Sequence, residues 1–185
     1  MGKSICLDVD GVIADIAGGI NRSLEKMGIV NYDYSHWLTT YHDDDLILQV
    51  MDNKLFWKNL KPFDDAWYQI NNWWSLGYDI YLVTSRRSES SQSMLPIWLD
   101  EWKIQYNRYY FTDMGAKIDV IKDLDPLFVV EDNYNEIKVL TENGVNCFMR
   151  RAWYNSEYWE DYESIGSLFE IDYEKELSKT SNVYG

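Results

Sequence analysis

The residues best suited to chemistry stand at the end of the first apolar run, in the sequence ICLDVDGVIAD. Asp8 and Asp10 lie two residues apart there, and Gly11 follows them. Side chains at this spacing on extended chain project to the same side, where two carboxylates repel unless a cation lies between them or they divide roles. Gly11 permits the sharp turn that such a site requires. The alternative interpretation is an ordinary turn after a strand.

Further polar groups follow the later apolar runs. Thr84 and Ser85 end the second run, and their hydroxyls and neighbouring N–H groups suit phosphate oxygens. Lys117 begins a helical pattern, and Glu131 and Asp132 end the fourth run. Each has an ordinary interpretation when taken alone: Thr84 and Ser85 as a turn, Lys117 as a surface lysine, and Asp132 as a helix cap. Their order, Asp-x-Asp, Thr, Lys and Glu-Asp, is the informative feature.

Strands and helices alternate in a way that brings these groups to one edge. Parallel strands alternating with crossover helices predict an α/β, Rossmann-like, doubly wound parallel sheet, in which ligands lie beyond the carboxyl ends of the strands. The predicted strands are Ser4–Leu7, Asp79–Val83, Tyr109–Phe111, Leu127–Val130 and Val145–Met149. The predicted helices between them are Asp64–Leu76, Met94–Trp102, Ala116–Leu124 and Asn133–Asn143.

One interval is too long for a single crossover. About seventy residues separate the first two strands, and they include helical patterns at Asp15–Met27 and Asp43–Met51. We therefore predict a small helical cap at residues 14–63, inserted after the first strand into a core made of residues 1–13 and 64–155. Residues 156–185 are predicted to form an extension that packs on the core or trails from it.

Composition narrows the class of ligand. The chain has 185 residues and a formal net charge of −14, which disfavours long nucleic acid as a partner. It has no apolar run of membrane-spanning length, and its two cysteines, Cys6 and Cys147, fall in apolar runs. These features predict a cytoplasmic protein without a membrane partner. The aromatic residues near the C-terminus are compatible with a homodimer.

The four motifs together resemble those of the haloacid dehalogenase-like hydrolase superfamily, in its phosphatase branch. The motifs are DVDGV, LVTSR, Lys117 and VVEDN. The resemblance implies Mg²⁺ held by Asp8, Asp132 and the backbone carbonyl of Asp10. It also implies an aspartyl-phosphate mechanism with Asp8 as nucleophile, Asp10 as general acid and base, and Thr84 and Lys117 as groups that stabilise the transferring phosphoryl group. Glu131 departs from the common Asp or Gly, which affects the outer shell of the metal site.

Within that superfamily the stretch LFWKNLKPFDDAWYQINNWWSLGYDIYLVTSR is most similar to 5′(3′)-deoxyribonucleotidases. This resemblance implies a (deoxy)nucleoside monophosphate as substrate, with Phe56 and Trp57 beside the nucleoside and Ser85 and Arg86 beside the phosphate. The other interpretation of Phe56 and Trp57 is packing of the cap onto the core. Trp37 in the cap is a weaker candidate for the pocket.

Other functions on the same fold stay open at this stage. The substrate could instead be the 3′-phosphate of a polynucleotide or a sugar phosphate. A phosphate-binding protein without catalysis is the third reading, although Asp10, Lys117 and Asp132 are all present.

Overall fold

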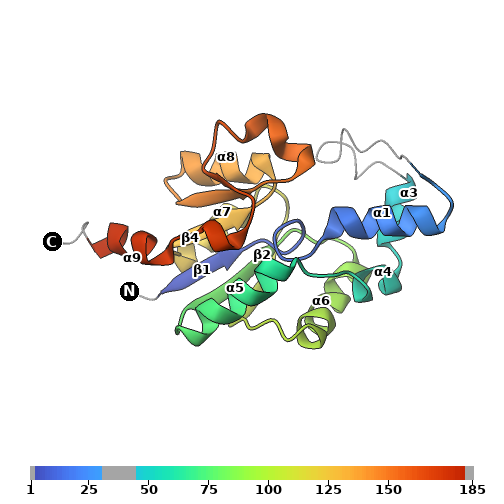
Figure 1. The fold of residues 1–185 in the computed structure, drawn as a ribbon, viewed down its shortest axis with the longest axis horizontal. Helices are drawn as coiled ribbons and strands as arrows, with labels where there is room; N and C mark the ends of the chain where they lie inside the picture. Colours follow the sequence, from blue (N-terminus) through green and yellow to red (C-terminus); the bar gives the residue numbers. More distant parts are fainter. Residues whose placement is uncertain (1–2, 31–44, 182–185) are drawn as a thin grey trace.

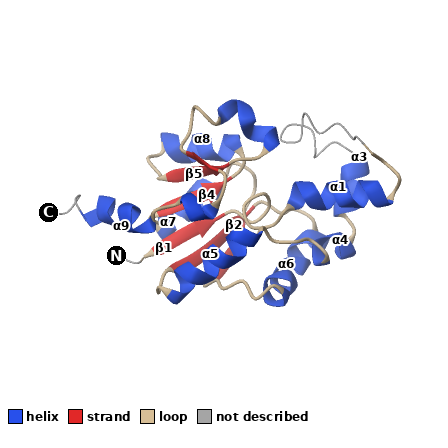
Figure 2. Ribbon diagram, viewed as in Figure 1, coloured by secondary structure: helices blue, strands red, loops and turns tan. Residues whose placement is uncertain are grey.

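The computed structural model describes residues 3–30 and 45–181. Within them lies one parallel sheet of six strands in the order β3-β2-β1-β4-β5-β6, with helices around it (Figure 2). The predicted α/β doubly wound sheet is therefore confirmed. The strands are β1 (Ser4–Leu7), β2 (Asp79–Thr84), β3 (Arg108–Phe111), β4 (Phe128–Glu131), β5 (Cys147–Arg150) and β6 (Ser164–Ile165).

Alternate residues of the buried strands face two separate layers of core. Leu7 and Leu82 belong to the layer that includes helices α5 (Asp64–Ser75) and α6 (Glu89–Glu101). Cys6 belongs to the opposite layer, which includes α7 (Lys117–Leu124) and α8 (Tyr134–Glu142). Both faces of the sheet are covered in this way, which explains why the strand sequences are apolar at nearly every position.

In the described part of the segment that joins β1 to α5, three helices lie beyond one end of the sheet (Figure 1). They are α1 (Ile16–Lys26), α3 (Asp45–Met51) and α4 (Lys54–Lys58). Asp15 caps α1 by accepting a hydrogen bond from the backbone N–H of Gly18. Trp37 falls outside the described residues, as does the predicted start of α3 at Asp43.

One helix begins earlier than the sequence predicts. Helix α6 begins at Glu89 instead of Met94, because the Ser88 side chain accepts from the N–H of Ser91 and so caps the helix earlier. The C-terminal extension packs on the core. It contributes β6 beside β5, the 3-10 helices η1 (Trp153–Tyr158) and η2 (Leu168–Glu170), and α9 (Tyr173–Ser181).

No helix among the described residues is long and apolar enough to cross a bilayer.

Candidate active site

Strand order explains why residues from distant motifs meet. Strand β1 lies between β2 and β4, so the chain leaves β1 towards one side of the sheet and later returns to the other. The carboxyl ends of strands around such a switch point form a crevice. Asp8, Thr84 and Glu131 all stand at these ends. The crevice is a cavity of about 550 Å³, lined by Asp8, Asp10, Ile16, Asp45, Leu48, Gln49, Met51, Asp52, Trp57, Thr84, Ser85, Arg86, Arg87, Ser88, Ser91, Met114, Lys117, Glu131, Asp132, Asn133 and Glu136.

Lys117 is buried in the crevice between two carboxylates. Its Nζ donates to Asp8 Oδ1 and to Glu131 Oε2, both at 2.6 Å. The lysine side chain is 3% exposed, so burial alone would lower its pKa, but the charges of Asp8 and Glu131 and their hydrogen bonds raise it. Lys117 therefore stays protonated and places a fixed positive charge beside Asp8.

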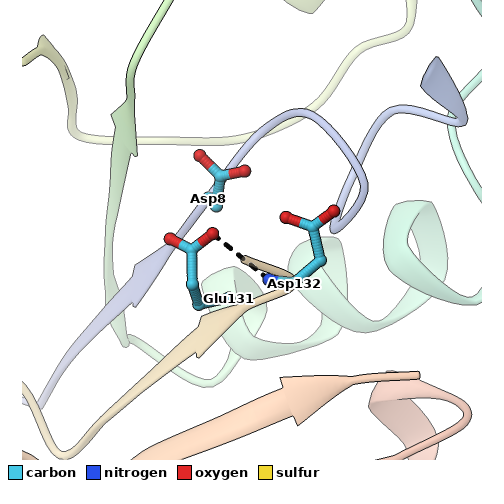
Figure 3. A group of neighbouring side chains, drawn as sticks. All are labelled: Asp8, Glu131 and Asp132. Atoms are coloured by element: carbon cyan, nitrogen blue, oxygen red, sulfur yellow. Dashed lines mark hydrogen bonds between the residues drawn. The ribbon is translucent and has the colours of Figure 1, made fainter. Parts of the chain in front are cut away.

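Three buried carboxylates nevertheless share this single lysine. One oxygen from each of Asp8, Glu131 and Asp132 lies within 4.8 Å of the others, and the three side chains converge beyond the ends of β1 and β4 (Figure 3). Burial raises the pKa of Asp8 well above its ordinary value, and the charge of Glu131 raises it further. Burial and Glu131 also raise the pKa of Asp132. With all three carboxylates ionised, the cluster would carry more negative charge than Lys117 offsets, which is why their charged forms are disfavoured without a cation.

This surplus charge fits a hard divalent cation. Glu131 is already occupied: Oε2 accepts from Lys117 and Oε1 accepts from the N–H groups of Asp132 and Asn133. Among the described residues, no hydrogen bond reaches Asp8 Oδ2 or Asp132 Oδ1. Those two oxygens are the ligands that Mg²⁺ would take from the side chains, while Glu131 holds its neighbours in place.

Asp132 is oriented by residues close to the C-terminal extension. The hydroxyl of Tyr154 donates to Asp132 Oδ2, and the Nδ2 of buried Asn155 donates to the carbonyls of Asp132 and Arg150 at 2.9 Å each. A Cβ atom at Gly11, whose φ is +86°, would overlap this carboxylate and the Tyr154 hydroxyl. Gly11 could be identified from the sequence because it belongs to the first motif, whereas the sequence predicted no role for Tyr154 or Asn155.

Asp10 forms a bidentate ion pair with Arg86. Arg86 Nε donates to Oδ2 at 2.8 Å and Nη2 donates to Oδ1 at 2.7 Å, while Nη1 donates to the carbonyl of Ser91 at 3.2 Å. The guanidinium also lies 4.3 Å from the ring centroid of Trp57, a residue of the cap helix α4. These bonds use three of the five N–H groups of the guanidinium, so Nη1 and Nη2 each keep one N–H for the predicted contact with phosphate.

The other predicted site residues differ in whether they line the cavity. Thr84 is buried at the end of β2 and lines the cavity, as does Ser85, whose hydroxyl lies 3.3 Å from that of Thr112. Trp57 lines the cavity but is 2% exposed. Phe56 does not line it and instead lines a second cavity within the cap.

Arg150 binds within the core instead of lining the crevice. Its Nη1 and Nη2 donate to the two carboxylate oxygens of Asp65 at 3.0 and 2.7 Å. Burial acts to raise the pKa of Asp65, but the hydrogen bonds and charge of Arg150 outweigh it, so the pKa lies below its ordinary value. This pair ties β5 to α5.

Known proteins share this fold. No family model matches the sequence, and no curated protein matches it either. Among solved structures, the fold matches hydrolases of the haloacid dehalogenase superfamily.

CbbY from Rhodobacter sphaeroides, solved with phosphate, has a TM-score of 0.62 and 16% identity over 93% of this chain and 97% of its own. A predicted phosphatase from Clostridium acetobutylicum has a TM-score of 0.60 and 14% identity, over 96% of this chain and 99% of its own. A haloacid dehalogenase-like protein from Streptococcus pneumoniae has a TM-score of 0.58 and 13% identity, over 88% and 93%. Because the sequence identities are this low, these comparisons show a shared fold and not a shared activity.

Proposed function

We propose that this protein is a Mg²⁺-dependent phosphomonoesterase that acts through an aspartyl phosphate. The observation that carries the proposal is the cluster of Asp8, Lys117 and Asp132 at the switch point of the sheet, beside Asp10. When bound by Asp8, Asp132 and the Asp10 carbonyl, Mg²⁺ would offset the repulsion between a phosphate ester and the Asp8 carboxylate.

The side chains divide the work of two displacement steps. A carboxylate oxygen of Asp8 forms a bond to phosphorus as the bond from phosphorus to the ester oxygen breaks, and Asp10 gives that leaving oxygen a proton. Asp10 then accepts a proton from water, whose oxygen attacks the phosphorus and releases phosphate and Asp8. Thr84 and Lys117 stabilise the transferring phosphoryl oxygens, Thr84 by a hydrogen bond and Lys117 by its charge.

The proposed substrate is a (deoxy)nucleoside monophosphate. The volume of about 550 Å³ suits a ligand of that size, and Ile16, Leu48 and Met51 provide apolar surface on the cap side. A sugar phosphate is the second candidate, because a mutant of CbbY with a similar fold was solved in complex with xylulose-(1,5)bisphosphate. The two buried free cysteines support a reducing, cytoplasmic location.

Phosphate release measured with Mg²⁺ tests the activity. We expect turnover on a panel of nucleoside monophosphates and sugar phosphates, and its loss in the Asp8→Asn variant with an unchanged circular dichroism spectrum. Asp100→Asn is the matched control, because the Asp100 side chain is 84% exposed and lies on α6 outside the cavity lining. Wild-type rates in Asp8→Asn would show that Asp8 is not the nucleophile.

A further inference from the structure

The two walls of the cavity differ in the charged groups that they present. Among the described residues, the cations that line it, Arg86, Arg87 and Lys117, come from the core. The same wall carries the carboxylates of the catalytic cluster and its surroundings: Asp8, Asp10, Glu131, Asp132 and Glu136. The described cap contributes two charged residues to the lining, and both are acidic: Asp45 and Asp52 of the α3 region. Because a cleft with apolar walls focuses the field of its charges, this asymmetry acts on whatever part of a ligand faces the cap.

The basic residues of the cap face elsewhere. Arg22, Lys26 and Lys61 line the second cavity, of about 440 Å³, on the other side of α3. Lys54 and Lys58 line neither cavity. The sequence of residues 31–44 contains no Lys or Arg. No described cation of the cap is therefore available to offset Asp45 and Asp52 within the crevice.

One contact connects the acidic wall to the core. Asp52 Oδ1 accepts from the hydroxyl of Ser90 at 3.5 Å, which connects the end of α3 to helix α6 of the core. Between the two carboxylates, α3 presents Leu48, Gln49 and Met51 to the cavity. A carboxylate only accepts hydrogen bonds, so this wall suits hydroxyl and ammonium donors and opposes anions.

We propose that the cavity selects monophosphate esters whose distal end is neutral and hydroxylated or carries an amine, and that it discriminates against a second phosphoryl group. The reacting phosphate would lie against Lys117 and the cation site, and the distal end against Asp45 and Asp52. This inference rests on the proposed function and adds the substrate class. It separates this chain from CbbY, whose mutant was solved with a bisphosphate.

Ligands that differ only in distal charge test the proposal. One set is glucosamine 6-phosphate, glucose 6-phosphate and glucose 1,6-bisphosphate. The other is 3′-amino-3′-deoxythymidine 5′-phosphate, thymidine 5′-phosphate and thymidine 3′,5′-bisphosphate. Within the set that is turned over, we expect kcat/KM for the bisphosphate to be roughly tenfold to hundredfold below that for the neutral monophosphate. The monophosphate that carries an amine should have a kcat/KM at least equal to that of the neutral monophosphate.

Variants locate the effect on the cap wall. In the double variant Asp45→Asn/Asp52→Asn, the ratio of kcat/KM for the monophosphate to kcat/KM for the bisphosphate should fall towards one. In the double variant Asp45→Lys/Asp52→Lys, this ratio should fall below one. Glu25→Gln removes a negative charge from an exposed position of α1 outside the cavity lining and should leave the ratio unchanged. This control separates the local wall from the net charge of −14.

Calorimetric binding of the same ligands with Mg²⁺ keeps this inference separate from the catalytic proposal. If none is turned over but the affinities follow the expected order and respond to the double variants, the catalytic proposal fails and the distal selection stands. If the bisphosphates bind and react as well as the monophosphates, or if both double variants leave the ratio unchanged, the distal selection is refuted.

Discussion

The ion pair between Arg86 and Asp10 gives the sharpest prediction. Replacing Arg86 with Gln removes two charge-assisted hydrogen bonds, of 2.8 and 2.7 Å, and leaves Asp10 without its partner. Breaking a buried pair costs about 3–5 kcal/mol, but the Asp10 side chain is 23% exposed and water would partly solvate it. We therefore expect a loss of about 2–3 kcal/mol in unfolding free energy, which corresponds to a Tm lower by roughly 4–12 °C.

The kinetic effect distinguishes two roles for Arg86. If it orients Asp10, kcat should fall about a hundredfold on an alkyl phosphate while KM changes little, because a displaced general acid loses most of its contribution. On p-nitrophenyl phosphate, whose leaving group departs without a proton, the fall in kcat/KM should be much smaller than on the alkyl phosphate, because kcat/KM reports the first displacement and not the later hydrolysis. If Arg86 instead binds the phosphate, as the sequence suggested, KM should rise on both substrates.

Two further variants complete the test. Arg86→Lys keeps the charge but not the planar fork, so its kcat should lie between the wild type and Arg86→Gln. Arg108→Gln is the matched control, because Arg108 is exposed, lies on β3 outside the cavity lining and forms no ion pair among the described residues. An unchanged kcat in Arg86→Gln, or an equal loss of kcat/KM on both leaving groups, would refute the positioning role.

Three other outcomes follow from the buried charges and thiols. Mg²⁺ at a hundredfold excess over its Kd should stabilise the fold by about 2.7 kcal/mol and raise Tm by roughly 5–10 °C in a thermal scan, reversibly with EDTA; Asp132→Asn should abolish this shift. Because the pKa of Asp65 is lowered in the fold, its pair with Arg150 stabilises the protein above the unfolded pKa and loses that effect as pH falls through the folded pKa. Asp65→Asn should therefore lower stability at pH 7 and flatten the acid limb in urea titrations, and an unaltered limb would contradict the pairing. Burial raises the pKa of Cys6 to about 12 and raises that of Cys147, so neither thiol should react with a disulfide reagent at pH 8 until guanidinium is added.

The meeting of the four motifs could be predicted from the sequence because it depends only on backbone topology. Parallel strands end at one edge, so Asp8, Thr84 and Glu131 had to converge once the strands were recognised. The partner of Arg86 could not be predicted in the same way. It depends on the direction in which a loop side chain points, and phosphate and Asp10 are equally good partners for a guanidinium fork.

Aromatic content limited the prediction of the cavity wall. Phe56 and Trp57 are adjacent on α4, so they point to different sides of a short helix, and only Trp57 reaches the crevice. With 30 aromatic residues in the chain, type and spacing do not distinguish a residue that lines a pocket from one that packs a core. Tyr154 is the opposite case: it contacts the site although its position in the sequence gave no sign of it. Its hydroxyl joins the 3-10 helix η1 to Asp132, which follows strand β4.

The sequence separation within the lysine cluster has a consequence for biosynthesis. Asp8 leaves the ribosome early, but Lys117 follows it by 109 residues, and Glu131 comes later still. Strand β1 is likewise incomplete until β4, its second neighbour, has been made. The nascent chain must therefore leave one edge of β1 unpaired, and Asp8 without its lysine, until Lys117 and β4 have been synthesised. Folding of this domain is expected to be largely post-translational, with the cap and its acidic wall able to form well before the charges that they face.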